Sequence, residues 1–394
     1  MRKKTVRDLD VGGKRVLVRV DFNVPFDRKT HTILDDTRIR AALPTIEYLI
    51  GQGAYTILCS HLGRPDGKVV EDLRLGPVAL HLAGLLKRDV TYCLEVVGPE
   101  VEEAIRLRRP GDVVMLENIR FSPGEEDNAP AFAKQLADLA EVYVNDAFGT
   151  AHRAHASTEG VARYLPAVAG FLMEKELEFL GRVVASPEHP MAVIIGGAKV
   201  SSKIGVLRNL LGKADRFLIG GGMANTFLAA QGKNVGASTV EQDVLATARE
   251  FLEQARQQGA RVLLPIDAVV ADRFAPDAAT QTVDIDAVPE GWLVLDIGPK
   301  TASLYAQEII DCATVLWNGP MGVFEMPAFA EGTHAVARAV ADVQGTTVVG
   351  GGETVAAVAE QGLEDQIDHV STGGGASLEY LEGQELPGVA ALLE

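Results

Sequence analysis

The stretch His369–Leu381, HVSTGGGASLEYL, decides the fold class, because a short strand-like run breaks at three glycines and continues directly as an amphipathic helix. Such a turn exposes backbone N–H groups, and the N-terminus of the following helix attracts negative charge, so phosphate is its natural ligand. The same pattern recurs at Arg216–Leu228 and Thr346–Val358, and Met191–Lys203 is a two-glycine version that carries lysines. A tight strand-to-helix connection explains any one of these turns, but all of them in one half of the chain favour a shared, multiply phosphorylated ligand.

The spacing of these glycines excludes two common nucleotide-binding motifs. A P-loop needs G-x-x-x-x-G-K-[ST], and the dinucleotide fingerprint needs G-x-G-x-x-G after a strand. Neither occurs, because Gly212 and Lys213 lack the glycine that a P-loop has five positions earlier. The familiar NTPase and dehydrogenase folds are therefore disfavoured.

Length and composition predict a soluble cytoplasmic protein of two domains. The chain has 394 residues, 47% hydrophobic and 23% charged, and about 150 residues per domain suggests two or three domains. No apolar run approaches the roughly 18 to 20 residues of a membrane span, and the net charge of -17 argues against nucleic acid and anionic membranes as partners. The three cysteines are far apart and form no C-x-x-C, which predicts reduced thiols.

Polar and basic residues follow each of the strands predicted in the first half. Its alternating strand-like and helical patterns predict a mostly parallel sheet with helices on both faces. In such sheets ligands bind beyond the carboxyl ends of the strands. A surface ion pair would explain any single arginine there, but the group as a whole predicts a receptor for a small polyanion. The residues concerned are Asp21, Asn23, His61, Arg64, Asn118, Arg120, Asp146, His152, Arg153 and His155, which Arg38 can join from the helix that opens at Asp36.

The second half repeats this architecture, with strands predicted at MAVIIG, RFLIG, RVLLPID, WLVLDIG, TVLWNG, TVVGG and HVSTG. Turns that follow these strands supply Lys199 and Lys203, and lysines suit phosphate oxygens. Other turns supply the carboxylates Glu325 and Glu353, of a kind that suits Mg²⁺ or a ribose hydroxyl. For Lys203, an ordinary solvated position on a helix is the alternative.

A helix predicted at Phe171–Val184 connects the two halves, and the prolines of Ser186–Pro190 end it. The tail ends in an apolar segment that is too short to be a domain, so it must dock on a part of the chain that is already folded. The predicted bounds are 1–170 for the first domain, 171–186 for the connecting helix, 187–379 for the second domain and 380–394 for the tail.

Motifs along the whole chain resemble the phosphoglycerate kinase family, in the order and with the lengths typical of that family. They are Arg19–Pro25 (RVDFNVP), Asp36–Ile39 (DTRI), Ser60–Pro65 (SHLGRP), Glu117–Phe121 (ENIRF), Asn145–Ser157 (NDAFGTAHRAHAS), Gly196–Lys203 (GGAKVSSK), Gly220–Phe227 (GGGMANTF), Trp317–Glu325 (WNGPMGVFE) and Ser371–Ala376 (STGGGA). The resemblance implies an α/β fold of two Rossmann-like, doubly wound lobes with mostly parallel sheets, joined by a connecting helix. It also implies a monomer whose C-terminal tail returns to the first lobe.

The activity that this resemblance implies is glycolytic phosphoryl transfer between 1,3-bisphosphoglycerate and MgADP, which gives 3-phosphoglycerate and ATP. In its terms, 3-phosphoglycerate binds Asp21, Asn23, Arg38, His61, Arg64, Arg120 and Arg153. The nucleotide binds Lys203, Gly221, Glu325, Gly351, Gly352, Glu353 and Thr354, and the transferred group meets Arg38, Lys199 and the N–H groups of Gly373, Gly374 and Gly375. One position departs from the family pattern, because Glu353 stands where Asp is usual. Its side chain is one methylene longer, which affects the geometry with which it would help to hold Mg²⁺ or a phosphate.

The implied mechanism needs no general base, since the acceptor carboxylate, with a pKa near ~4, is already ionised at neutral pH. The protein aligns the reactants and stabilises charge, and the two lobes must close around them. Two alternatives stay open: another kinase that forms an acyl phosphate, and a catalytically silent nucleotide-binding module. A silent module is expected to have lost Arg38 or Lys199, and both are present.

Overall fold

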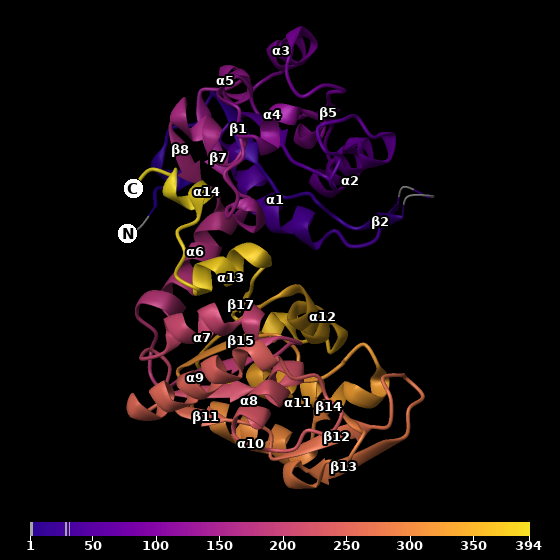
Figure 1. Cartoon of the computed structure of the whole chain (residues 1–394). Helices are drawn as coiled ribbons and strands as arrows, with labels where there is room; N and C mark the ends of the chain where they lie inside the picture. The colour runs from indigo at the N-terminus through magenta and orange to yellow at the C-terminus, as the bar shows by residue number, and fades with distance from the viewer. Residues whose placement is uncertain (1–2, 28–29, 31) are drawn as a thin grey trace. The chain divides into compact units, whose positions relative to one another are not determined.

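A computed structural model describes residues 3–27, 30 and 32–394 of the chain (Figure 1). The chain divides into two compact units, one formed by Met1–Glu178 with Glu385–Glu394 and the other by Phe179–Gln384. In the described ranges, no helix combines the length and the apolar composition that crossing a membrane requires.

The first unit is built on a six-stranded parallel sheet in the order β5-β6-β4-β1-β7-β8. Its central strand β1 places Val18 opposite Leu58 on one side and Val144 on the other, and all three side chains are fully buried. Both faces of this sheet are covered, so β1 is a nearly continuous apolar run. The strands are β1 (Arg15–Arg19), β4 (Tyr55–Cys59), β5 (Val90–Tyr92), β6 (Val113–Met115), β7 (Val142–Asn145) and β8 (Ala167–Ala169), beside a small β2–β3 hairpin (Phe26–Asp27 and Thr32–Ile33).

Helices of the first unit bury one face against this sheet. In α1, Ile39, Ala42, Ile46 and Leu49 recur at helical spacing and are buried in the core of this unit. The helices are α1 (Thr37–Gly51), α2 (Gly76–Leu86), α3 (Pro99–Arg106), α4 (Pro123–Glu126), α5 (Pro130–Asp138) and α6 (Phe171–Ala185), with 3-10 turns at Val6–Asp8, Glu71–Leu73, Ile119–Phe121, Phe148–Thr150 and Gly160–Arg163. The division between the two units falls inside α6.

The second unit contains another six-stranded parallel sheet, in the order β11-β10-β9-β15-β16-β17. Its core lies between this sheet and helices such as α10 and α11, where Trp317 and Tyr305 are fully buried. The strands are β9 (Met191–Ile195), β10 (Arg216–Ile219), β11 (Arg261–Leu263), β15 (Thr314–Asn318), β16 (Thr346–Gly350) and β17 (His369–Val370). The helices are α7 (Ile204–Leu210), α8 (Gly221–Ala230), α9 (Leu245–Gln257), α10 (Pro299–Ile309), α11 (Glu331–Ala341), α12 (Gly352–Glu360) and α13 (Gly375–Leu381), with 3-10 turns η6 (Val200–Ser202), η7 (Gln242–Val244), Ile285–Ala287, Pro327–Phe329 and Glu364–Gln366.

The prediction of two mostly parallel α/β lobes is confirmed, but it missed a separate antiparallel sheet in the second unit. This sheet has the order β13-β12-β14, from β12 (Asp267–Ala271), β13 (Thr280–Asp284) and β14 (Leu293–Ile297). The predicted strand WLVLDIG is therefore antiparallel to β12. The predicted RVLLPID divides after Leu263, and Pro265, which has no N–H to donate, lies in the break.

The last residues of the chain pack against the first unit. In Figure 1 the yellow α14 (Pro387–Ala390) lies near β7 and β8, which are formed much earlier in the chain. The N–H of Gly388 donates to the carbonyl oxygen of Ala151 at 2.8 Å, and that of Leu393 donates to Ala167 of β8 at 2.9 Å. Leu386 and Leu392 are buried, so backbone and side chains both hold this segment in place.

Candidate active site

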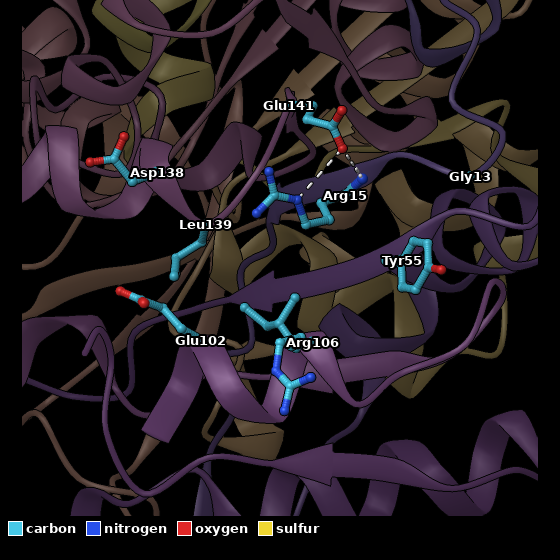
Figure 2. Close-up of a pocket in the computed structure, with 9 residues that line it drawn as sticks. Gly13, Arg15, Tyr55, Glu102, Arg106, Asp138, Leu139 and Glu141 are labelled. Atoms are coloured by element: carbon cyan, nitrogen blue, oxygen red, sulfur yellow. Dashed lines mark hydrogen bonds and ion pairs between the residues drawn. The ribbon is translucent and has the colours of Figure 1, made fainter. Parts of the chain in front are cut away.

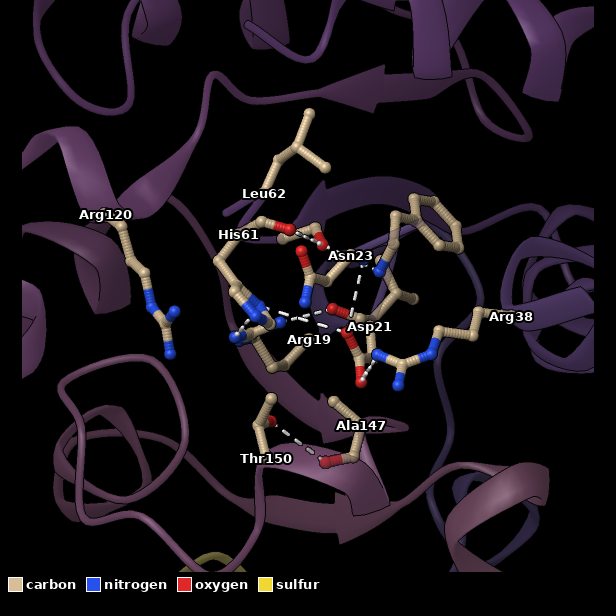
Figure 3. Close-up of polar contacts among 12 residues, drawn as sticks. Arg19, Asp21, Asn23, Arg38, His61, Leu62, Arg120, Ala147 and Thr150 are labelled. Carbon is tan, nitrogen blue, oxygen red and sulfur yellow. Dashed lines mark hydrogen bonds and ion pairs between the residues drawn. The ribbon is translucent and has the colours of Figure 1, made fainter. Parts of the chain in front are cut away.

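The carboxyl ends of β1, β4 and β7 bring the loops of the first unit together (Figure 3). The N–H of Val20, directly after β1, donates to Cys59 at the end of β4 at 3.1 Å. The N–H of Asp146, directly after β7, donates to Arg19 at the end of β1 at 2.8 Å. Three segments that are distant in the sequence therefore begin their loops side by side.

Arg19 and His61 form the buried centre of this site. Arg19 is fully buried, and its Nε donates to Ser157 Oγ at 2.8 Å while a terminal nitrogen donates to His61 Nδ1 at 3.1 Å. Because a guanidinium can only donate, Nδ1 of His61 is the acceptor and the ring proton is on Nε2. Burial and the neighbouring Arg19 and Arg120 hold the pKa of His61 well below its usual value, so the ring is neutral. The contact of 4.0 Å between His61 Nδ1 and an oxygen of Asp21 is therefore not an ion pair, because the ring carries no charge.

Asp21 orients Arg38, the first of the predicted catalytic residues. One carboxylate oxygen of Asp21 accepts from Arg38 at 2.8 Å, and the other accepts from the N–H of Asn23 at 3.3 Å. The amide oxygen of Asn23 in turn accepts from the N–H of Gly63 at 2.9 Å. The Arg38 side chain remains 38% exposed, so its guanidinium is fixed at one end and available to a ligand at the other.

Arg120 is a buried cation whose charge is only partly compensated. It is 4% exposed, and one terminal nitrogen donates to the carbonyl oxygen of Gly63 at 2.9 Å. Its Nε has no hydrogen-bond partner in the described part of the chain and lies 3.4 Å from Glu126. Burial lowers the pKa of Arg120. A buried cation with a free donor is suited to an anionic ligand.

Glu125 and Ser157 form a hydrogen-bonded chain with Arg19. None of these three residues was predicted from the sequence to be part of the site. Glu125 is fully buried, and its carboxylate accepts from the hydroxyl and the N–H of Ser157 at 2.6 and 3.0 Å. His155 Nδ1 lies 3.8 Å from the same carboxylate, but burial, together with Arg120 and other nearby cations, lowers the pKa of His155 to about 4. The signal for Arg19 was present, because a charged residue in the apolar strand RVLVRV needs a buried partner.

Of the other predicted residues, Arg153 lies within electrostatic range of Arg120 and His155, and its Nε donates to His152 at 3.4 Å. Arg64 is exposed and makes no hydrogen bond or ion pair with the described residues. The structure therefore brings together Asp21, Asn23, Arg38, His61 and Arg120 (Figure 3).

A separate pocket of about 450 Å³ opens at the other end of the same sheet (Figure 2). It is lined by Arg15 and Tyr55, the first residues of β1 and β4, so it lies at the amino ends of the strands. Arg15 is already paired with Glu141 at 3.5 Å. This pocket therefore differs from the predicted site, because it lies at the opposite end of the strands and its Arg15 is already paired with a carboxylate.

In the second unit, glycines allow three strand-end loops to pack closely. Gly197 donates its N–H to Pro320 at 3.0 Å, and Gly221 donates to Met321 at 2.9 Å. Gly221 has φ of +68°, and a Cβ there would lie 2.6 Å from the nitrogen of Gly197. The N–H of Gly221 is thus already used within the protein, so this glycine shapes the loops through its small size and its backbone conformation.

The two predicted lysines of the second unit differ in their surroundings. Lys203 donates to the side-chain oxygen of Asn318, which is fully buried at the end of β15. Burial lowers the pKa of Lys203, and the nearby carboxylate of Glu353 opposes that shift. Lys199 is exposed, and in the described ranges its side chain has no hydrogen-bond or ion-pair partner. Lys203 therefore connects the loop after β9 to the end of β15, whereas the ammonium of Lys199 is free.

The remaining predicted groups of the second unit lie at the starts of α12 and α13 and after β15. Thr354 is buried and accepts from the N–H of Gly319 at 2.7 Å, whereas Glu353 and Glu325 are exposed and unpaired among the described residues. Gly351, at the N-cap, and Gly352 begin α12. Gly373 donates its N–H to Ser371 at 3.2 Å, and the N–H groups of Gly374 and Gly375 have no partner in the described part of the chain.

No three His, Cys, Asp or Glu side chains of the described chain are grouped so that they could hold a metal ion. Glu353 is nevertheless an exposed carboxylate without a hydrogen-bond or ion-pair partner in those ranges, and it is close enough to Lys203 to affect the pKa of that lysine. Mg²⁺ commonly binds through one or two carboxylates together with phosphates and water. The residues present therefore fit a metal ion that is carried mainly by a nucleotide.

Comparison with known proteins gives one consistent family. The model of the family described as phosphoglycerate kinase matches residues 6–384. A phosphoglycerate kinase of Moorella thermoacetica is 62% identical over 394 residues and covers 100% of both chains, and one of Herpetosiphon aurantiacus is 58% identical over 392 residues, covering 100% of this chain and 99% of the relative. The solved phosphoglycerate kinase of Coxiella burnetii has a TM-score of 0.90 at 42% identity and covers 99% of this chain and 98% of its own. That of Pyrococcus horikoshii has a TM-score of 0.85 at 35% identity, with coverages of 100% and 98%.

Proposed function

Because the chain belongs to the phosphoglycerate kinase family, whose members catalyse reversible phosphoryl transfer in glycolysis, we propose that its first unit binds phosphoglycerate and its second unit binds the nucleotide. The observation that carries this proposal is the buried basic cluster at the strand ends of the first unit. Arg19 and Arg120 are buried there beside two neutral histidines, with Arg38 partly exposed beside them.

The substrate site that we propose suits a phosphorylated carboxylate. Its guanidinium groups pair with phosphate and carboxylate oxygens in a two-pronged geometry. His61 can donate from Nε2, because Nδ1 is occupied by Arg19. With their lowered pKa values, His61 and His155 are poor bases, which agrees with an acceptor that arrives already ionised. The proposed ligands of 3-phosphoglycerate are Asp21, Asn23, Arg38, His61, Arg64, Arg120 and Arg153.

Arg64→Ala is expected to raise the Kd for 3-phosphoglycerate by about ten- to a hundredfold, since a hydrogen bond to a charged group contributes about 1.5 to 3 kcal/mol. Arg64 has no partner among the described residues, so its loss should leave the melting temperature unchanged. Isothermal titration calorimetry measures the Kd. Lys68→Ala, which removes another exposed cation of the same loop, is the matched control. Equal affinities for the Arg64→Ala variant and the wild type would remove Arg64 from the site.

For the second unit, we propose that the nucleotide contacts Lys203, Gly221, Glu325, Gly351, Gly352, Glu353 and Thr354. Lys203 brings a positive charge to the strand ends, and the start of α12 offers the positive end of its dipole. The transferred phosphoryl group spreads its charge over three equatorial oxygens. We assign these oxygens to Arg38, Lys199 and the glycine turn Gly373–Gly375, in which Gly374 and Gly375 have free N–H groups among the described residues.

Bound Mg²⁺ would neutralise charge on the nucleotide phosphates. We propose Glu353 as the carboxylate of the chain that helps to hold it. Glu353 lies in the first turn of α12 and is exposed. In the family pattern this position is usually Asp, and the extra methylene can be taken up by a different rotamer or by a bridging water. The competing role is that Glu353 only complements the helix dipole, which contributes about 0.3 to 1 kcal/mol.

Glu353→Gln is expected to raise the Mg²⁺ concentration that gives half-maximal activity, because the amide cannot supply the negative charge that favours a cation. Glu353→Asp should keep activity within roughly tenfold, a barrier change of ~1.4 kcal/mol. A magnesium titration of steady-state activity tests both variants. Glu360→Gln, on the same helix, is the control. An unshifted midpoint for Glu353→Gln would leave Glu353 as a residue that only stabilises the helix.

We also propose a monomer that works in the cytoplasm, with no nucleic acid or membrane partner. The net charge of -17 and the three free, buried cysteines support this view. The functional bounds that we propose are residues 1–170 for the phosphoglycerate lobe, 171–186 for the connecting helix, 187–379 for the nucleotide lobe and 380–394 for the tail. Size-exclusion chromatography with light scattering tests the monomer, since a larger mass at working concentration would contradict it.

A further inference from the structure

The carboxylate of Glu241 occupies the N-terminal end of the short turn η6, directly after Lys199. One of its oxygens accepts from the N–H groups of Val200 and Ser201 at 2.6 and 3.2 Å, and the other accepts from the hydroxyl of Ser201 at 2.5 Å. Glu241 lies 41 residues further along the chain, just before η7. Three donors of the GGAKVSSK segment are therefore satisfied by one distant carboxylate.

This contact changes how the GGAKVSSK turn can meet its ligand. From the sequence we expected its backbone N–H groups to approach phosphate. Those of Val200 and Ser201 are instead bonded to Glu241, and that of Gly197 donates to Pro320 at 3.0 Å. The charged groups that the segment still offers to a phosphate are the ammonium groups of Lys199 and Lys203.

Lys199 lies between two points at which this segment is fixed to α8. On one side, the N–H of Met223 in α8 donates to the carbonyl oxygen of Gly197 at 2.9 Å. On the other side, Glu241 donates its own N–H to the hydroxyl of Thr226, also in α8, at 3.1 Å. Thr226 is 1% exposed, so this attachment point is buried. The segment from residue 197 to residue 201 is therefore fixed at both ends to one helix.

The two lysines depend on this arrangement to different degrees. The side chain of Lys203 is held directly by Asn318, whereas that of Lys199 has no partner among the described residues. Lys199 has an extended backbone, with φ of -133° and ψ of 131°, at the N-cap of η6. The position of its ammonium thus depends on the backbone, and Glu241 fixes the backbone immediately after it.

We propose that Glu241 is a positioning residue for phosphoryl transfer, which acts by holding the backbone that presents Lys199. This inference rests on the proposed catalytic role of Lys199 and names no new ligand. Its physical basis is that a misplacement of about 1 Å at a reacting centre can cost about a hundredfold in rate. Hydrogen bonds to an ionised acceptor are also the stronger kind, so one carboxylate can hold three donors firmly.

Replacing Glu241 with alanine is expected to lower kcat by about ten- to a hundredfold. The KM for ADP should change less, because Lys203 and the glycines Gly351 and Gly352 at the start of α12 remain in place. Asp243→Ala is the matched control, because it removes an exposed carboxylate two residues away that accepts no hydrogen bond from Val200 or Ser201, so it should leave kcat unchanged. Formate should restore much of the kcat of Glu241→Ala in a saturable way, because it can fill the cavity and accept from the same donors.

Hydrogen exchange provides a readout that does not depend on activity. The amides of Val200 and Ser201 should exchange faster in Glu241→Ala than in the wild type, and formate should slow them again. Unchanged kcat with faster exchange would overturn the positioning role. A fall in kcat that formate does not reverse, together with a lower melting temperature, would overturn it as well, because general destabilisation would then explain the loss.

The double variant Lys199→Ala/Glu241→Ala separates this inference from the proposed function. If Glu241 acts through Lys199, removing Glu241 should cost much less in the Lys199→Ala background, because coupled sites are not additive. Full additivity would overturn the inference while leaving Lys199 catalytic. If Lys199→Ala alone kept near-normal kcat, the proposed role of Lys199 would be wrong, and the positioning role of Glu241 would be overturned with it.

Discussion

Arg38→Ala is expected to lower kcat by about two to three orders of magnitude, as the loss of one donor does at other oxyanion sites, where each contributes ~3 to 4 kcal/mol. Asp21 holds one end of the guanidinium at 2.8 Å, so the group is already oriented before substrate arrives. Nucleotide binding should change far less, because Arg38 belongs to the first unit and the loss is felt chiefly in the transition state.

Steady-state kinetics with 3-phosphoglycerate and ATP measure this effect, and calorimetry measures nucleotide binding. The matched control is Arg40→Ala, on the same helix, where the side chain is exposed and paired with Asp36 at 2.9 Å. Arg38→Ala with near-normal kcat would show that this arginine does not meet the transferred group. An equal loss in the Arg40→Ala variant would instead indicate damage to α1.

Lys199→Ala should lower kcat to a similar extent, by about two to three orders of magnitude, because its exposed ammonium has no ion-pair partner among the described residues and is available to the transferred group. Its stability should stay close to that of the wild type, since Lys199 is exposed and its side chain has no partner in the described ranges. The melting temperature is therefore an internal check on the kinetic result.

Single-turnover measurements distinguish the step that is lost, because they separate phosphoryl transfer from product release. Lys233→Ala is the control, since Lys233 is also partly exposed in this unit but pairs with Asp286. A Lys199→Ala variant with slow turnover but unchanged phosphoryl transfer would contradict the assigned role, as would a variant with unchanged turnover.

The parallel sheets could be predicted from the sequence because buried strands are nearly continuous apolar runs, such as Val16–Val18 of β1. The same criterion could not find β13, because the strand TQTVD is almost entirely exposed. The same criterion also could not show that β14 pairs in antiparallel orientation, since an apolar run does not reveal the direction of the neighbouring strand. Strand pairing depends on contacts that a local pattern does not contain.

Residues that follow a strand could be located for the same reason, and Asp21, His61 and Arg120 do lie together at one end of the sheet. Their supports could not be predicted, because they come from distant segments. Glu125 reaches Ser157 across 32 residues, and Val200 reaches Glu241 across 41. The tautomer of His61 is set by one hydrogen bond from Arg19, which no local pattern shows.

The packing of α14 against the first unit has a consequence for synthesis on the ribosome. The N–H of Lys4 donates to the carbonyl oxygen of Leu393 at 2.8 Å, and the carbonyl oxygen of Ala151 accepts from Gly388. The first unit therefore contains residues from both ends of the chain. A nascent chain cannot complete this fold until all of Phe179–Gln384 has been made, a delay of about 10 to 40 s at roughly 5 to 20 residues per second. During that interval Ala151 and Ala167 lack their final partners, and a polypeptide released early keeps them exposed to chaperones and proteases.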